Sequence, residues 1–151
     1  MSMLQDLYQD LIVDHSKRPR NHKKLEDYNY SAEGYNPLCG DRLKLFLKVD
    51  DQGVIRDVGF EGAGCAISTA SASLMTETLK NQTLQQAHSL FELFHYMLTG
   101  PEDPAHKGKG LGKLAVFSGV REFPVRVKCA TLAWHTLESA LRKEKEPART
   151  E

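Results

Sequence analysis

Residues 43–60 read LKLFLKVDDQGVIRDVGF, and the pattern within this stretch decides the fold class. Apolar residues alternate with other residues over 43–49, as in a strand that buries one face. The buried face is expected to consist of Leu43, Leu45, Leu47 and Val49, and the opposite face of Lys44, Phe46 and Lys48. The segment Asp50–Gly53 is typical of a hairpin turn, because Gly53 can adopt a positive φ angle. A second strand, antiparallel to the first, is therefore expected at 54–60.

Helical patterns surround this hairpin. Before it, the spacing of apolar residues predicts an amphipathic helix over about 3–15, followed by a third strand at 28–33. After it, we expect helices at 66–80, from a capping box at Thr83 to Leu98, at 113–118, and after Pro124. Because strands come before most of the helices, the predicted class is α+β, with a small antiparallel sheet covered by helices.

Length and charge balance narrow the function classes. A chain of 151 residues fits one domain, expected at 1–143, followed by a charged flexible tail at 144–151. Lys and Arg together number 20, as do Asp and Glu, so the formal net charge is zero. This balance argues against a protein that binds nucleic acid or an anionic membrane through bulk charge. A local basic run at 17–24 is flanked by acidic residues, so we interpret it as a solvated loop or a docking edge for a protein partner.

Hydropathy indicates no membrane or export signal. No apolar run approaches the roughly 20 residues of a membrane span. The first residues lack the basic and then apolar pattern of a signal peptide. The expected compartment is therefore the cytoplasm.

Cysteine usage is the most informative feature of the composition. The three cysteines, Cys39, Cys65 and Cys129, are odd in number and lie far apart, with no CxxC pair. A closed disulfide framework, a zinc ribbon and a thioredoxin motif are therefore excluded. Two interpretations remain open: a site that the fold assembles, or three unrelated buried thiols.

The surroundings of each cysteine favour metal binding. An extended backbone at Cys39-Gly40-Asp41 would point the thiol and the carboxylate to the same side, and both groups are zinc ligands. Cys65 and Cys129 each lie near an expected helix start, where unpaired N–H groups favour a thiolate. Each motif also has a structural explanation, as a surface turn around Cys39 and as buried core positions for the other two cysteines.

Three cysteines and Asp41 together supply four ligands, the number in a tetrahedral zinc site. Their combined charge of −4 becomes −2 with Zn²⁺, and Arg126 and Lys128 beside Cys129 would offset part of the remainder. No spacing rule brings the four groups together in space, so the shared site remains one of the two interpretations.

The motifs that contain these residues resemble those of the SufU branch of the IscU-type iron–sulfur cluster assembly proteins, which are NifU N-terminal-like. The resemblance is carried by NPLCGD at 36–41, FEGAGCAIS at 60–68 and FPVRVKCA at 123–130, and by Leu7-Tyr8, Asp14-His15 and Arg18–Asn21. Three ordered motifs over nearly the whole chain make this resemblance specific.

The resemblance implies a three-stranded antiparallel sheet packed against helices, with a metal site at one end. It implies Cys39, Asp41, Cys65 and Cys129 as ligands of a metal, which in the SufU branch is zinc. It also implies a SufS-type, pyridoxal-phosphate-dependent cysteine desulfurase as partner, and iron–sulfur assembly proteins downstream.

Two departures from the classical IscU pattern favour the SufU branch. Lys128 occupies the position before the third cysteine, where the classical pattern has histidine, and the segment near 100–113 is longer. The implied function is a zinc-bound acceptor of persulfide sulfur. We expect Cys39 to be the accepting thiol because it lies on the turn beside Gly40, and Arg126 to steady negative charge or meet the partner.

Two alternatives remain. The first is a scaffold that assembles and transfers a [2Fe–2S] cluster, because three cysteines and an aspartate can also hold iron. The second is a zinc ion that only stabilises the fold, which a chain of this length does not require.

Overall fold

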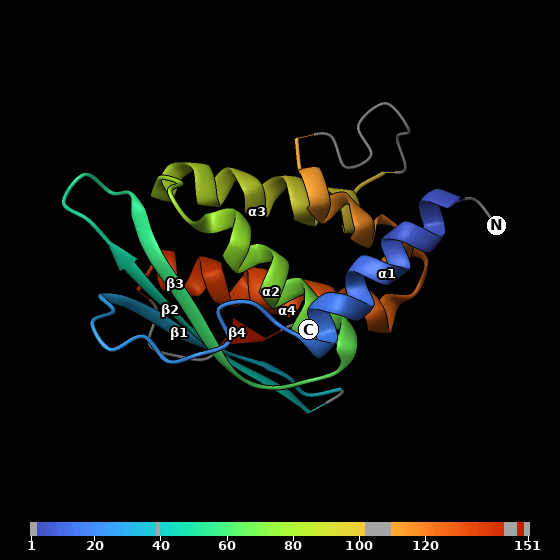
Figure 1. The fold of residues 1–151 in the computed structure, drawn as a ribbon, viewed down its shortest axis with the longest axis horizontal. Helices are drawn as coiled ribbons and strands as arrows, with labels where there is room; N and C mark the ends of the chain where they lie inside the picture. The colour runs from blue at the N-terminus through green and yellow to red at the C-terminus, as the bar shows by residue number, and fades with distance from the viewer. Residues whose placement is uncertain (1–2, 39, 102–109, 144–147, 150–151) are drawn as a thin grey trace.

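The protein is an α+β structure with one sheet and helices packed against it (Figure 1). This computed structural model describes residues 3–38, 40–101, 110–143 and 148–149. The elements are α1 (Met3–Lys17), β1 (Tyr30–Asn36), β2 (Asp41–Val49), β3 (Ile55–Ala63), α2 (Ala66–Leu79), α3 (Leu84–Thr99), the 3₁₀ helix η1 (Gly112–Glu122), α4 (Pro124–Leu141) and β4 (Ala148–Arg149). Among the described residues, no helix is long and apolar enough to cross a membrane.

The three predicted strands form an antiparallel sheet with β2 in the centre. The expected hairpin is present between β2 and β3, and the expected third strand is β1. The structure adds β4, which pairs in parallel with Gly34 and Tyr35 at the outer edge of β1. The two residues of β4, Ala148 and Arg149, fall within the tail expected at 144–151, whose other residues lie outside the described part of the chain.

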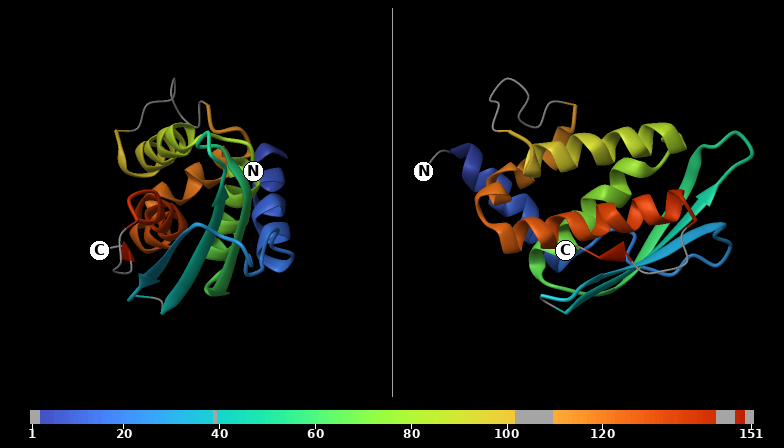
Figure 2. Two further views of the ribbon diagram at one scale, coloured as in Figure 1. Left: turned by 90° about the vertical axis from the view of Figure 1, so that its left-hand side faces the viewer. Right: turned by 180° about the vertical axis from the view of Figure 1, so that it is seen from behind.

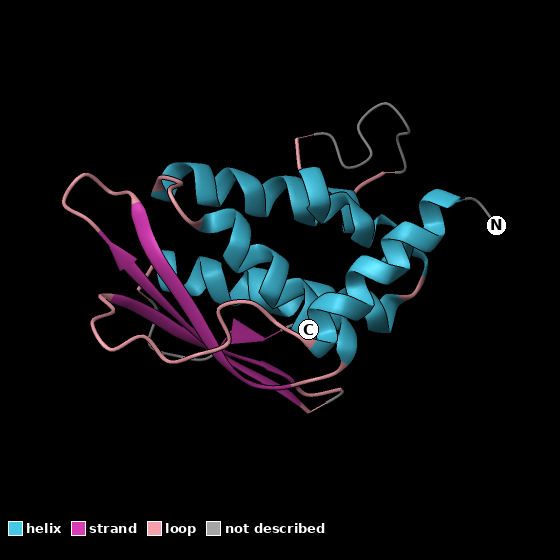
Figure 3. Ribbon diagram, viewed as in Figure 1, coloured by secondary structure: helices cyan, strands magenta, loops and turns pink. Residues whose placement is uncertain are grey.

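The helices form layers on one side of the sheet (Figures 2 and 3). Helices α2 and α4 pack against the strands, and α3 and η1 contact α4. The helix expected at 113–118 is a longer 3₁₀ helix, and Pro124 begins α4 rather than preceding it, as proline often does at the first helical position.

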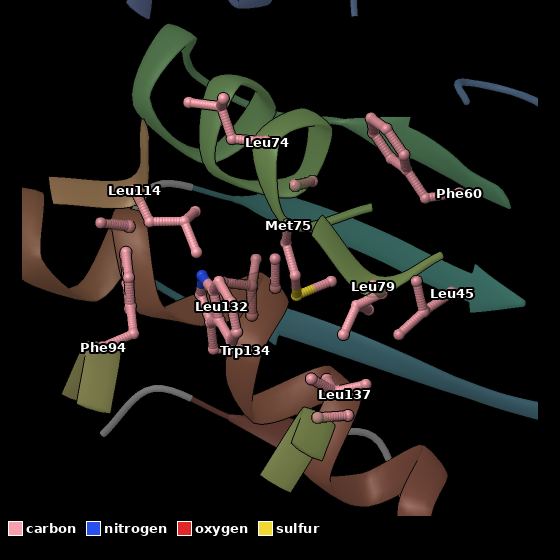
Figure 4. Close-up of a cluster of buried hydrophobic side chains, with 14 of the residues drawn as sticks. Leu45, Phe60, Leu74, Met75, Leu79, Phe94, Leu114, Leu132, Trp134 and Leu137 are labelled. Carbon is pink, nitrogen blue, oxygen red and sulfur yellow. The ribbon is translucent and has the colours of Figure 1, made fainter. Parts of the chain in front are cut away.

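The hydrophobic core lies between the sheet and these helices (Figure 4). Leu45 and Leu47 on the inner face of β2 are fully buried, as the alternation predicted. Across from the strands, the ring of Trp134 stacks on that of Phe94 with centroids 4.7 Å apart, which joins α4 to α3. This stacking holds α3 against α4, which itself packs on β1 and β2.

Phe46 differs from its two lysine neighbours on the outer face, because it is fully buried. The segment between α1 and β1 crosses this half of the outer face. The ring of Tyr28 lies 5.0 Å from that of Phe46, and Asn21 accepts a backbone hydrogen bond from Phe60 on β3. The alternation therefore identified the two faces of β2 but could not reveal that loop residues cover part of the second one.

A buried polar contact joins α1 to α2. His15 is 1% exposed, and its Nδ1 lies 2.7 Å from Oγ of Ser73. The same Ser73 oxygen accepts the backbone N–H of Arg20 at 2.8 Å. The histidine thus serves in packing at the end of α1, and the contact ties α1 to α2, the helix that Cys65 caps.

Candidate metal centre

Three of the four predicted ligands meet at one end of the sheet. Asp41 begins β2, Cys65 lies between β3 and α2, and Cys129 lies in α4. One ligand atom from each of the three lies within 4.8 Å of the others. Asp41 and Cys129 are buried and Cys65 is half-buried. The fourth, Cys39, lies outside the described residues, so its place in the set remains a prediction.

Asp41 is held by Cys65, which lies between β3 and α2. Its Oδ1 accepts the backbone N–H of Cys65 at 3.0 Å, and its Oδ2 lies 3.8 Å from the Cys65 sulfur, which donates to it. In the sheet, Asp41 stands opposite Asn36, the last residue of β1. The carboxylate is therefore oriented by the chain itself, at the edge of the sheet where β1 ends and β2 begins.

Cys65 is the N-cap of α2, as its predicted place at a helix start requires. Its sulfur accepts the backbone N–H of Ser68 at 3.4 Å, and the Ser68 hydroxyl donates to the Cys65 carbonyl at 3.2 Å. Gly64 lies so close that an added Cβ would stand 2.3 Å from the Ser68 hydroxyl and 3.2 Å from Oδ1 of Asp41. Only glycine leaves space for this arrangement.

Cys129 lies one turn further into its helix than expected. Because Pro124 begins α4, Cys129 falls in the second turn, beyond the N–H groups that a helix start leaves unpaired. Its Sγ instead lies 3.8 Å from Nδ2 of Asn36. A second hydrogen bond, from the Ser71 hydroxyl to the carbonyl of Ala130 at 2.6 Å, ties this part of α4 to α2.

Asn36 belongs to the first cysteine motif, but the sequence predicts no role for it in the site. In the structure its side chain is fully buried beside Cys129. The strand pattern could have identified this position as buried, because Ala32, Gly34 and Asn36 alternate along β1 and all three are buried. A polar residue on a buried strand face needs a polar partner.

The rim of the site is apolar and basic. Leu38, Phe123 and Val125 are 61%, 46% and 53% exposed, which is unusual for large apolar side chains near a buried cluster. The guanidinium of Arg126 is exposed and lies 4.6 Å from the centre of the Phe123 ring. A role for Arg126 in balancing the charge of the site remains a prediction.

The donor set fits zinc. Two thiols and a carboxylate converge in a largely buried position, which is the mixture of sulfur and oxygen ligands that Zn²⁺ accepts. Thiolates also bind iron in clusters, so the same donors are compatible with iron–sulfur chemistry. The geometry therefore supports a metal centre formed by Asp41, Cys65 and Cys129.

Comparisons with known proteins agree with this geometry. The family described as "NifU-like N terminal domain" matches residues 7–130. The chain is 42% identical over 141 residues to the "Zinc-dependent sulfurtransferase SufU" of Bacillus subtilis, covering 93% of each chain. It is 41% identical over 143 residues to the "Iron-sulfur cluster assembly scaffold protein IscU" of Streptococcus pyogenes, covering 95% of this chain and 87% of the relative.

A solved structure is similar over most of its length. This is a protein of Fervidobacterium islandicum described as a putative iron–sulfur cluster assembly scaffold protein for the SUF system. It superposes with a TM-score of 0.80 at 39% identity, covering 91% of this chain and 98% of the other.

Proposed function

The chain belongs to the family of NifU-like N terminal domains, and from this membership we propose that it is a zinc-bound acceptor of persulfide sulfur in iron–sulfur cluster assembly. The proposed sulfur donor is a SufS-type cysteine desulfurase. The proposed recipients are iron–sulfur assembly proteins downstream, in the reducing cytoplasm, where cysteines remain thiols.

The observation that carries the proposal is the convergence of Asp41, Cys65 and Cys129 within 4.8 Å. The mixed sulfur and oxygen donors support zinc, and the similarity to a relative named as a zinc-dependent sulfurtransferase points the same way. The ligands we propose are these three residues and Cys39. When bound, zinc would keep the cysteines as thiolates at neutral pH.

The transfer step is an exchange between sulfur atoms. A thiolate of this protein attacks the outer sulfur of the desulfurase persulfide, and a new S–S bond forms as the old one breaks. The desulfurase cysteine leaves as a thiolate, so the pair undergoes no net oxidation or reduction. The product is a persulfide on the acceptor.

We assign the accepting thiol to Cys39 and the fixed positions to the other two cysteines. Cys65 caps α2 and Cys129 lies within α4, so both sulfurs are held by regular structure. Cys39 belongs instead to the short segment between β1 and β2. Asp41, the one oxygen donor, would be the ligand that sets how readily the site opens.

Arg126 is assigned a role at the rim. Its exposed guanidinium over Phe123 is available to a partner, while its position one helical turn before Cys129 lets it steady negative charge at the site. The exposed apolar side chains of Leu38 and Val125 would contact the desulfurase on the same side.

A second candidate function is a scaffold for a [2Fe–2S] cluster. The similarity to the Streptococcus relative, which is named as a scaffold, favours this alternative, as do the thiolate donors. In this case the cluster is cargo, and the protein would release it to an apo-protein.

Metal analysis combined with a turnover assay distinguishes these functions. We expect one tightly held zinc per chain after purification, and faster turnover of a SufS-type desulfurase when the chain is added. Iron with visible absorbance would instead indicate the scaffold. Zinc without any effect on desulfurase turnover would indicate that the metal only stabilises the fold.

A further inference from the structure

Asn36 connects two parts of the metal centre through one side chain. It is fully buried at the end of β1, directly opposite Asp41. Its Oδ1 accepts the backbone N–H of Leu38 at 3.2 Å, and its Nδ2 lies 3.8 Å from Sγ of Cys129. Its backbone carbonyl also accepts the N–H of Gly40 at 2.9 Å.

The chemistry of the neighbours determines which end of the amide faces the sulfur. A backbone N–H can only donate, so the side-chain atom that faces Leu38 must be the oxygen. The NH₂ group must then face Cys129, where it can donate to the sulfur. This assignment does not depend on distinguishing nitrogen from oxygen by their positions alone.

Such a donor matters most where a thiolate is buried. Cys129 is 4% exposed and lies beyond the unpaired N–H groups of the α4 start. A buried charge needs hydrogen bonds or a counter-ion. A group that donates a hydrogen bond to a metal ligand orients that ligand and tunes how strongly it binds the metal. Asn36 supplies an N–H to this sulfur from a different element of the fold.

We infer that Asn36 is a positioning residue of the metal centre, which donates Nδ2–H to the Cys129 thiolate while the same side chain holds the turn that leads to Asp41. The inference rests on the proposed function, because it requires Cys129 to act as a metal-binding thiolate. Through its bonds to Leu38 and Gly40, Asn36 also fixes the backbone on either side of Cys39 in the sequence.

The test is the variant Asn36→Asp, which keeps the oxygen for the Leu38 N–H but replaces the donor to sulfur by a second oxygen. We expect its zinc affinity, measured by competition with a chromogenic chelator, to fall by about 10- to 100-fold, as for other outer-shell partners. The matched control is Asn29→Asp. Asn29 also accepts a backbone N–H and donates to a carbonyl, both of Val49, far along the same strand pair. This control is expected to bind zinc as the wild type does.

A spectroscopic measurement separates positioning of the sulfur from general stability. In protein loaded with Co²⁺ instead of zinc, loss of a hydrogen bond to a thiolate makes the sulfur a stronger electron donor. The thiolate-to-cobalt absorption band should therefore move to longer wavelength in Asn36→Asp and in Asn36→Ala, but not in Asn29→Asp. The alanine variant also serves if the aspartate variant does not fold.

The outcomes distinguish this inference from the function on which it rests. If wild-type protein binds no metal, the proposed function fails. If wild-type protein binds zinc, but folded Asn36 variants retain the wild-type affinity and cobalt band, Asn36 only forms a turn and the inference is overturned. Failure of both Asn36 variants to fold would assign the residue to fold stability and overturn it as well.

Discussion

The backbone N–H of Cys65 donates to Oδ1 of Asp41 at 3.0 Å, so two of the predicted ligands are joined by a hydrogen bond of the chain itself. This bond connects the start of β2 to the start of α2. It explains how residues far apart in the sequence reach one site, and it makes Asp41 both a structural acceptor and a predicted ligand.

Asp41→Asn separates these two roles. The amide retains an oxygen for the Cys65 N–H, but it is neutral and therefore a weaker zinc ligand. We expect the fold to persist and zinc to dissociate more than about 10-fold faster. Loss of a residue that only supports a ligand already costs about 10-fold or more, and loss of a ligand itself should cost more than that minimum. Zinc release to a chelator measures this rate, and an unchanged rate would exclude Asp41 as a ligand.

Gly64→Ala should disturb the site by overpacking. The added Cβ would stand 2.3 Å from the Ser68 hydroxyl, and forcing such a contact costs about 1–3 kcal/mol of unfolding free energy. Thermal unfolding and zinc affinity should both decrease. The double variant with Ser68→Ala, which removes the closest atom, should recover most of the lost stability.

Gly119→Ala is the control for this experiment, because nothing lies within 4 Å of the added Cβ. It should change neither stability nor zinc affinity appreciably. If Gly64→Ala behaved in the same way as this control, the close approach of Gly64 to Asp41 would not matter for stability or for zinc binding.

Cys39→Ser tests the assignment of the accepting thiol. A serine hydroxyl is not an effective nucleophile toward a persulfide at neutral pH, because it stays protonated. After incubation with desulfurase and cysteine, we expect the mass of the wild type to increase by one sulfur atom. We expect no such increase in the variant. Transfer at the wild-type rate would move the role to Cys65 or Cys129.

Arg126→Ala should weaken the interaction with the partner. Removing one exposed cation costs about 1 kcal/mol or less, so the desulfurase should require up to about fivefold more of the variant for half-maximal stimulation. Zinc affinity should also decrease slightly, because this cation is proposed to steady negative charge at the site. Arg56→Ala, which removes an exposed arginine paired with Asp50 on the β2–β3 hairpin, is the control.

His15 should make the fold less stable in mild acid. Burial lowers the pKa of His15 below its usual value of 6.5, and the positive charge of Arg20 adds to this effect. The unfolded chain therefore takes up this proton first as the pH falls, so stability is full above about pH 6.5 and decreases below it.

Replacing His15 by Asn keeps a polar group near Ser73 and removes the titration. Denaturant unfolding from pH 7.5 to pH 5 should show a smaller loss of stability in His15→Asn than in the wild type. His135, whose pKa burial also lowers, and His88, whose pKa the Glu138 carboxylate raises, are present in both proteins. Their contributions cancel in the comparison, and identical slopes would show that His15 is not responsible.

Most of the fold could be predicted from the sequence, because local patterns dominate it. The alternation over 43–49 identified β2, and the capping box at Thr83 marked the start of α3, where both of its hydrogen bonds are present. The fold class and the order of strands and helices followed. The pairing of β4 with β1 could not be predicted, because a two-residue strand has no periodicity to detect.

The ligands of the site could be predicted from the sequence, but the residues that position those ligands could not. Donor types pointed to Asp41 and the cysteines, and the structure brings three of the four together. The donor from Asn36 and the space at Gly64 depend on the approach of elements distant in the sequence. No spacing within one segment encodes such contacts, so only the assembled fold reveals them.

The pairing of both sheet edges has a consequence for association in solution. β4 occupies backbone groups of β1 at Gly34 and Tyr35, while Ile55 and Phe60 on β3 donate their N–H groups to Gln82 and Asn21. Edges occupied in this way offer fewer free groups to a strand of a second molecule. At these positions the described part of the sheet, whose central strand is rich in leucine, is less open to edge-to-edge pairing.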